Sequence, residues 1–219
     1  MKQFSLFLGI ALAIIFTSCC KEIIRGKGNI GSITMNVPTF TAVETHSDIK
    51  AIISYATYLE VTATGYENLL NILDFKVENG VLKLNFNTTY NTIRNGNIVA
   101  TIKLPVLSSA VIHGNKNLEV SDFSNGASFN AAIHGNGNIL VRNCNYQSAV
   151  LEIHGRGSIE AQGLQIKEAV SSIHNSGNCS VSVTDKLVAK IFAAGNIYYW
   201  GNPLLEIALN GNGKVVKRY

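Results

Sequence analysis

The chain has 219 residues, a formal net charge of +4 and 47% hydrophobic residues. The positive charge is too small and too scattered to indicate a nucleic-acid-binding surface. Beyond the N-terminus, no apolar run is long enough to span a membrane as a helix.

Residues 1–18 resemble the signal peptide of a bacterial lipoprotein. Lys2 gives a positive start, and the apolar run up to Phe16 is too short for a stable membrane-spanning helix. Cys19 and Cys20 follow, and the resemblance implies that one of them becomes the lipidated N-terminus after cleavage. Cys19 fits better because Phe16, an apolar residue, stands three positions before it; Cys20 is the alternative. An ordinary secretory signal with incidental cysteines is the other interpretation.

This pattern predicts a protein of the cell envelope, held by its lipid on the outer membrane and facing the periplasm or the outside. Residues 19–39 form a segment after the anchor, and residues 40–219 form a single domain, because no Pro- or Ser-rich linker divides them. Val, Ile, Thr, Asn and Ser are abundant, and apolar and polar residues often alternate. Alternation of this kind predicts β-strands, with residues 67–73 as the one candidate for a short helix.

A phrase that recurs about every 20 residues dominates the second half of the chain. Its copies begin 18–21 residues apart and are Ile112-His-Gly-Asn-Lys-Asn-Leu118, Ile133-His-Gly-Asn-Gly-Asn-Ile139, Ile153-His-Gly-Arg-Gly-Ser-Ile159, Ile173-His-Asn-Ser-Gly-Asn-Cys179, Ile191-Phe-Ala-Ala-Gly-Asn-Ile197 and Leu209-Asn-Gly-Asn-Gly-Lys-Val215. A fixed period of this length is typical of stacked coils. We therefore expect a parallel β-helix, or β-solenoid, with about 18–21 residues per coil and a less regular N-terminal half.

Within one copy, alternation assigns each residue to the core or the surface. Ile153 and Ile159 are expected to face the core, and His154 and Glu160 to face solvent. We expect the glycines to permit positive φ in the turn, and the turn asparagines at 117, 138, 178 and 196 to form a ladder of side-chain amides that Ser158 interrupts. Weaker copies at residues 24–30 and 93–98 extend the pattern upstream, and Ile98 stands one period before Leu118.

Together with Phe40-Thr-Ala-Val43, Lys50-Ala-Ile-Ile-Ser54 and the segment from Leu69 to Phe86, the Gly-x-Gly-Asn-Ile phrase resembles the GIN domain of secreted and lipid-anchored bacterial proteins. The resemblance covers most of residues 40–219. It implies a β-helix-like fold and a surface role as the head of an adhesin, with some relatives described as lipid-binding proteins. It implies no catalytic activity. The usual phrase in that family reads Ser-Gly-Ser-Gly, whereas this chain has His in place of the first Ser in four copies.

Those four histidines, His113, His134, His154 and His174, form the first candidate site. Imidazoles one strand apart could bind a transition metal or respond to pH. A straight column presents parallel rather than converging ligands, so passive stacking of the rings is the simpler interpretation. We expect no cofactor.

The second candidate site is aromatic. Phe192, Tyr198 and Trp200 lie near the last copies and would form a ligand-binding platform if all three face outward. Alternatively, they close the end of the stack. Of the two cysteines beyond the signal, Cys179 shares the column of Ile159 and is expected to be a small core residue, and Cys144 shares no column with it, which disfavours a disulfide.

These observations favour a non-catalytic binding or adhesion module that recognises a glycan, lipid or protein through one face of the solenoid. A structural envelope scaffold is the alternative, and homo-oligomerisation is left open because solenoid ends are unpaired edges. A polysaccharide-active enzyme is least favoured, because Glu152 and Glu160 approach each other only if the turn between them brings them together, and the phrase holds no other pair of carboxylates.

Overall fold

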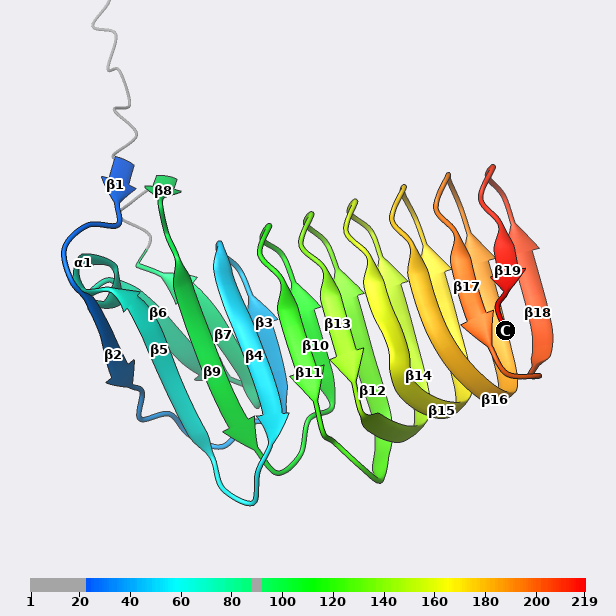
Figure 1. The fold of residues 1–219 in the computed structure, drawn as a ribbon, viewed down its shortest axis with the longest axis horizontal. Helices are drawn as coiled ribbons and strands as arrows, with labels where there is room; N and C mark the ends of the chain where they lie inside the picture. The colour runs from blue at the N-terminus through cyan, green and yellow to red at the C-terminus, as the bar shows by residue number, and fades with distance from the viewer. Residues whose placement is uncertain (1–22, 88–91) are drawn as a thin grey trace, which may run out of the picture.

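The computed structural model describes residues 23–87 and 92–219. The expected signal peptide, Cys19 and Cys20 lie outside the described residues. The described chain is almost entirely β-structure, and Figure 1 shows it as an elongated stack of coils with β1 at one end and β17–β19 at the other. This confirms the β-solenoid predicted from the repeat.

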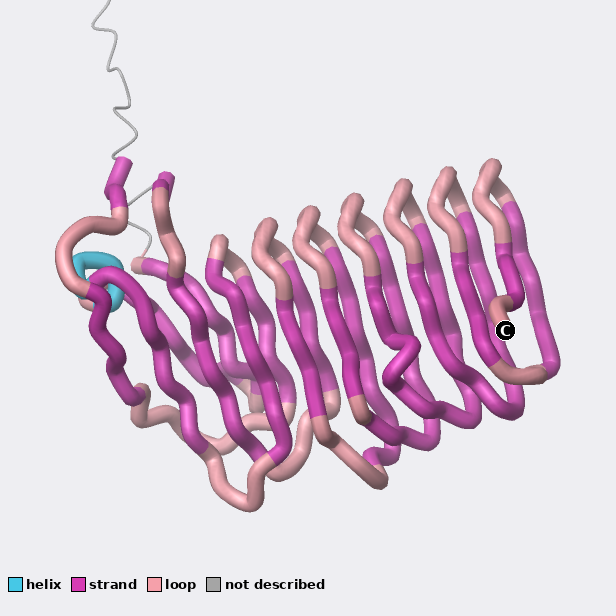
Figure 2. The backbone as a smooth tube through the Cα atoms, viewed as in Figure 1, coloured by secondary structure: helices cyan, strands magenta, loops and turns pink. Residues whose placement is uncertain are grey.

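Two layers of strands face each other across the core (Figures 1 and 2). The first layer contains, in spatial order, β6 (Leu73–Glu78), β7 (Val81–Phe86), β3 (Ala42–Thr45), β10 (Ser109–Ile112), β12 (Gly126–Ile133), β14 (Cys144–Ile153), the later parts of β15 (Ile159–Ile173) and β16 (Cys179–Ile191), and β18 (Leu204–Leu209). The second layer contains β2 (Ile30–Thr34), β5 (Glu60–Tyr66), β9 (Ile98–Leu104), β4 (Ile49–Tyr55), β11 (Leu118–Ser121), β13 (Ile139–Arg142), the first parts of β15 and β16, β17 (Ile197–Trp200) and β19 (Val215–Lys217).

Antiparallel strands end the stack on its N-terminal side. β6 pairs with β7, β5 pairs with β9, and β2 pairs with β5, all antiparallel, whereas the coils beyond them are parallel. Helix α1 (Glu67–Leu70) packs against β2 and β5 and buries Leu69 and Leu70, so the expected helix exists but is shorter than residues 67–73. β1 (Ile23–Arg25) and β8 (Thr92–Arg94) form a separate parallel pair.

The first coil of the parallel stack is out of sequence order. Ile98 stands one period before Leu118 in the sequence, but the two residues do not lie on adjacent strands. Ile98 pairs with Ile49, and Leu118 pairs with Ala51, so β4 lies between β9 and β11. The chain therefore forms one coil from β3 and β4, folds back to build the N-terminal end, and resumes the stack at β10.

Aliphatic columns fill the space between the layers. Ile133, Ile153 and Ile173 pair in register on adjacent strands, and each is fully buried. Cys179 pairs with Ile159 and is equally buried, as expected for a core position. Burial of a branched aliphatic side chain is worth about 1.5–3 kcal/mol, so each added coil stabilises the stack by covering the one before it.

The glycines of the turns are required for a different reason from the expected one. Positive φ is found at Gly28, Gly80 and Gly201 but not at Gly157. A Cβ at Gly157 would lie 1.8 Å from the carbonyl oxygen of Gly137, the equivalent glycine of the preceding coil. The close approach of consecutive turns, rather than turn geometry within one coil, excludes side chains there.

The polar ladder has the expected amide contact at one rung, where Nδ2 of Asn196 donates to Oδ1 of Asn178 at 3.2 Å, and its other bonds join side chains to backbone. Asn117 and Asn138 each accept a hydrogen bond, through the side-chain oxygen, from the backbone N–H of the residue one coil later, at 3.0 and 2.7 Å. Ser158 continues the ladder, because its hydroxyl accepts from the N–H of Asn178 at 3.4 Å. Each side chain thus satisfies a turn N–H of its neighbour.

Candidate functional site

A stack of six aromatic rings runs along the edge where the strands of the first layer enter the turns. Neighbouring ring centroids are 4.3–4.9 Å apart and ring planes lie within 8–10° of parallel. We call this set the ring column, and its members in order are His46, His113, His134, His154, His174 and Phe192. The structure therefore brings together all four histidines expected from the repeat and adds one residue at each end.

Strand register explains why His46 belongs to the ring column. Thr45 pairs with Ile112, so the next residues, His46 and His113, are neighbours on adjacent coils. The repeat pattern missed His46 because its turn, His46-Ser-Asp-Ile49, contains no glycine. A usable signal was present, since Glu44-Thr-His46 and Glu152-Ile-His154 share the same alternation and the same acid two residues before the histidine.

Close packing affects the protonation of the column. Burial lowers the pKa of His113 below its ordinary value, and the neighbouring rings His46 and His134 lower it further. Burial also lowers the pKa of His174, and His154 adds to the effect. Stacked imidazoles disfavour adjacent positive charges, so these two rings favour the neutral form.

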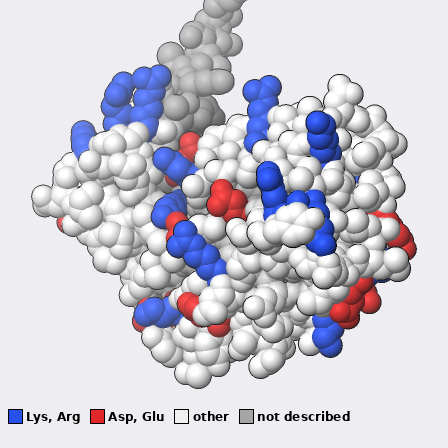
Figure 3. Space-filling model, turned by 45° about the vertical axis from the view of Figure 1, so that its right-hand side comes forward, with Lys and Arg blue, Asp and Glu red and all other residues white. Residues whose placement is uncertain are grey.

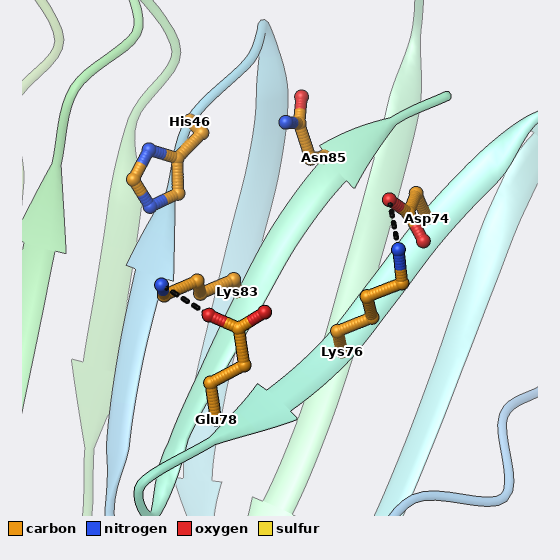
Figure 4. Close-up of a pocket in the computed structure, with 6 residues that line it drawn as sticks. All are labelled: His46, Asp74, Lys76, Glu78, Lys83 and Asn85. Atoms are coloured by element: carbon orange, nitrogen blue, oxygen red, sulfur yellow. Dashed lines mark hydrogen bonds and ion pairs between the residues drawn. The ribbon is translucent and has the colours of Figure 1, made fainter. Parts of the chain in front are cut away.

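A shallow polar pocket of about 230 Å³ adjoins the start of the ring column, on the outer face of the first layer (Figure 4). Its lining residues come from β3 or its turn, β6 and β7, and are His46, Asp74, Lys76, Glu78, Lys83 and Asn85. Lys83 contacts Glu78 at 2.6 Å and Lys76 contacts Asp74 at 2.9 Å. The two lysines are thus paired with carboxylates of the pocket, and the imidazole of His46 is paired with Glu44, 3.0 Å away.

The three aromatic residues expected near the last copies fall into two groups. Phe192 follows β16 in the first layer and stacks on His174, 4.6 Å away, with 43% of its surface exposed. Tyr198 and Trp200 extend outward from β17 in the second layer, while Tyr199 between them is buried. The guanidinium of Arg218 lies 4.7 Å from the ring centre of Tyr198. Phe192 thus lies on one layer and the pair on β17 on the other, so the three rings do not share one face.

Carboxylates do not form a catalytic pair at the repeat. Glu152 points outward from the first layer and Glu160 outward from the second, on opposite sides of the core. Figure 3 shows acidic and basic side chains close together on the visible face. Ion pairs between described residues include Lys50 with Glu119 at 2.7 Å. Cys144 and Cys179 are buried free thiols, and burial raises the pKa of Cys179 to about 12.

Hollows lined by described residues are open to solvent, with volumes that include about 190, 220 and 230 Å³ and, beside β2 and β5, about 430 Å³. Enclosed small-molecule sites usually measure about 300–1,000 Å³ and bury most of the ligand. Among the described residues, no helix has the length and apolar character needed to cross a membrane.

Comparison with known proteins agrees with this architecture. The sequence model of the family described as "Putative auto-transporter adhesin, head GIN domain" matches residues 39–203. A search of curated proteins gives no match.

Solved structures of similar fold come from species of Bacteroides and Parabacteroides. A "putative adhesin" from Bacteroides fragilis NCTC 9343 has a TM-score of 0.69 at 17% identity, and the match covers 89% of this chain and 100% of that one. A "Putative lipid binding protein" from Parabacteroides distasonis ATCC 8503 has a TM-score of 0.56 at 19% identity, covering 90% and 100%. A "putative adhesin" from Parabacteroides merdae ATCC 43184 has a TM-score of 0.55 at 17% identity, covering 90% and 99%. At these identities the likeness concerns the fold.

Proposed function

The chain belongs to the family of auto-transporter adhesin head GIN domains, and from this membership we propose that it is a non-catalytic binding module of the bacterial cell envelope. One observation carries the proposal: Tyr198 and Trp200 project from the same strand on the outer face of the second layer, with Arg218 over the first ring. Tyr, Trp and Arg are the residue types most enriched where binding energy concentrates.

The flatness of the surface points to an extended ligand. The hollows are shallow, and the outer faces of both layers are β-sheets, so a chain-like ligand or a protein surface fits better than an enclosed small molecule. We propose a glycan as the first ligand class, because a sugar ring offers a flat apolar face to Trp200 and hydroxyl groups to Arg218. Lipid, which the description of one structural neighbour names, and protein are the other classes to be tested.

The anchor proposed at Cys19, with Cys20 as the alternative, gives this surface a direction. The first described residue, Ile23, lies in β1 at the opposite end of the solenoid from β17 (Figure 1). A lipid attached a few residues before Ile23 would hold the N-terminal end near the outer membrane and place Trp200 far from it. Mass spectrometry of the chain isolated from membranes, with Cys19→Ala and Cys20→Ala as matched variants, identifies the lipidated residue.

Binding is tested with the full chain in detergent against panels of envelope glycans, lipids and proteins. Trp200→Ala is expected to remove saturable binding, whereas Phe192→Ala, which alters an exposed ring on the other layer, is expected to keep it. Equal loss in both variants would assign binding to another surface. An absence of binding to every panel would favour the alternative, a structural scaffold of the envelope. Turnover of a polysaccharide would instead show that the chain is a polysaccharide-active enzyme.

We also propose that two copies associate through their C-terminal ends. In the last described coil, the core-facing residues Ile207 and Leu209, which pair with the buried Ala189 and Ile191, are 50% and 49% exposed, and the outward-facing Leu204 is 67% exposed. The N-terminal end is covered by antiparallel strands, so the open end of a second copy is the one matching surface that this chain itself supplies. A two-fold contact of this kind is self-complementary and closes without forming a fibre.

A further inference from the structure

We propose that Glu44, His46 and His113 form a binding site for a divalent transition metal ion such as Zn²⁺. The three residues lie at the start of the ring column, and their potential ligand atoms are all within 4.8 Å of one another. This site goes beyond the binding surface at Tyr198 and Trp200, which lies at the other end of the molecule (Figure 1).

Local structure fixes the three side chains on one face. In β3, Val43 and Thr45 point into the core, so Glu44 and His46 alternate with them and face outward. The N–H of His113 donates to the carbonyl of Thr45 at 2.8 Å, which sets the two imidazoles on adjacent coils side by side. The carboxylate of Glu44 lies 3.0 Å from Nε2 of His46. Two strands thus supply three ligands without any loop rearrangement.

The spacing suits a metal ion. Bonds from Zn²⁺ to His nitrogen and carboxylate oxygen are about 2.0–2.2 Å long, so two ligands of one ion lie about 3–4 Å apart. The 3.0 Å contact between Glu44 and His46 already falls in this range. The rings of His46 and His113 are stacked, with centres 4.4 Å apart and planes 8° from parallel, so each must tilt out of the stack to direct an in-plane nitrogen lone pair at a shared ion. Water would complete a tetrahedral set on the exposed side.

Charge at the site favours a cation. Glu44 is next to Lys83 across the β3–β7 pairing, but the ammonium of Lys83 contacts Glu78 at 2.6 Å. Lys83 is therefore bonded to another carboxylate, although its charge still interacts with that of Glu44, and the direct contact of Glu44 is with His46. A carboxylate among two imidazoles gives the mixed oxygen and nitrogen ligand set that Zn²⁺ accepts readily.

A later coil provides a natural comparison. Glu152 and His154 repeat the spacing of Glu44 and His46, yet their closest atoms are 3.8 Å apart. Among the described residues, Glu44, His46 and His113 are the one set of three His, Cys, Asp or Glu side chains with ligand atoms this close together. The other described rings of the ring column have no carboxylate as close as Glu44 is to His46. The proposed metal site is therefore confined to the His46 end of the column.

The test uses the full chain in detergent, without an added histidine tag. Isothermal titration with ZnCl₂ and the visible absorption of bound Co²⁺ report stoichiometry and ligand geometry, and the melting temperature reports linkage to folding. We expect one ion per chain and a rise in melting temperature. Glu44→Gln and His113→Phe should each weaken binding at least tenfold, while Glu152→Gln and His174→Phe, which change the matching acid and an equivalent ring elsewhere, should leave it unchanged.

Phe replaces His in these variants because Phe192 occupies the same column with the same stacking geometry, so the fold is expected to persist. Melting curves without metal verify this. The proposal is overturned if excess Zn²⁺ binds nowhere, if more than one ion binds per chain with equal affinity, or if Glu152→Gln weakens binding as much as Glu44→Gln. Neither result bears on the proposed binding surface at Trp200, because Trp200→Ala leaves the three metal ligands intact and the two sites are tested separately.

Discussion

Phe192 lies flat on His174, with ring centroids 4.6 Å apart and planes 9° from parallel. Phenylalanine can neither bind a metal nor titrate, so at this rung the ring column works through packing alone. We predict that His174→Ala lowers the free energy of unfolding by about 1 kcal/mol, because it removes the stacking contacts on both sides of the ring. His174→Phe should preserve stability. Chemical denaturation of both variants measures the difference, and equal losses would show that the imidazole has a role besides stacking.

Acidification should destabilise the same part of the column. His174 lies between His154 and Phe192, and its pKa is below its ordinary value because of burial first and of His154 second, with Glu152 acting in the opposite direction. A depressed histidine pKa means that the unfolded chain binds more protons as the pH falls through about 6.5. Stability is therefore complete above that pH and decreases below it.

Melting temperatures recorded between pH 7.5 and 5.5, with a chelator present, check this prediction. The fall should be smaller in His174→Phe, which retains the ring and removes the titrating group. A variant with the same pH dependence as the original chain would place the effect on other groups.

The columns of the core could be predicted from the sequence, because each copy carries its own alternation and copies in register repeat the same residues. The core positions of Ile153 and Ile173 could be assigned from the alternation within their own copies. The Phe192 end of the ring column follows from the same repeat, because Phe192 holds the histidine position of its copy, whereas the His46 end required knowledge of other parts of the chain. His46 belongs to the column because β3 pairs with β10, and these strands are separated by more than 60 residues.

Coil order was not predictable for the same reason. The spacing from Ile98 to Leu118 equals one coil, but β4 occupies the place between their strands. A repeat period gives the number of residues in a coil, but it does not determine which earlier strand that coil pairs with. The coil that follows Ile173 is also shorter than the one before it. The difference is taken up by two register shifts between β15 and β16, one near Ala161 and one near Ile166. Both shifts lie on the side of the coil opposite the glycine turns, so the turns remain aligned.

Turn glycines should be far more sensitive than glycines with unusual backbone angles. A Cβ at Gly157 would lie 1.8 Å from the Gly137 carbonyl oxygen, so Gly157→Ala must push two coils apart. We expect a loss of about 3 kcal/mol. Gly28 has a φ of +93° and open space around it, and Gly28→Ala should cost only about 1–2 kcal/mol from backbone strain. Urea denaturation of the two variants compares them, and a milder effect at Gly157 would mean that the turns are less closely stacked than described.

The open C-terminal end should control self-association. β18 is the last strand of the first layer, and its core-facing Ile207 and Leu209 extend the columns of Ala189 and Ile191, which are fully buried one coil earlier. Charges introduced at these two positions would be buried without partners in an end-to-end dimer, but would stay hydrated in a monomer. We therefore predict that Ile207→Lys with Leu209→Lys shifts the protein from dimer to monomer.

Sedimentation of the Cys19→Ala/Cys20→Ala chain, which removes lipid-driven aggregation, measures the shift. Tyr58→Lys is the matched control, because Tyr58 is a comparably exposed apolar residue, 52% accessible, that lies outside β18. It should leave the dimer intact. A chain that is monomeric before any substitution, or a dimer that survives both lysines, would contradict the proposed contact, since Ile207 and Leu209 are both core-facing residues of the last described coil.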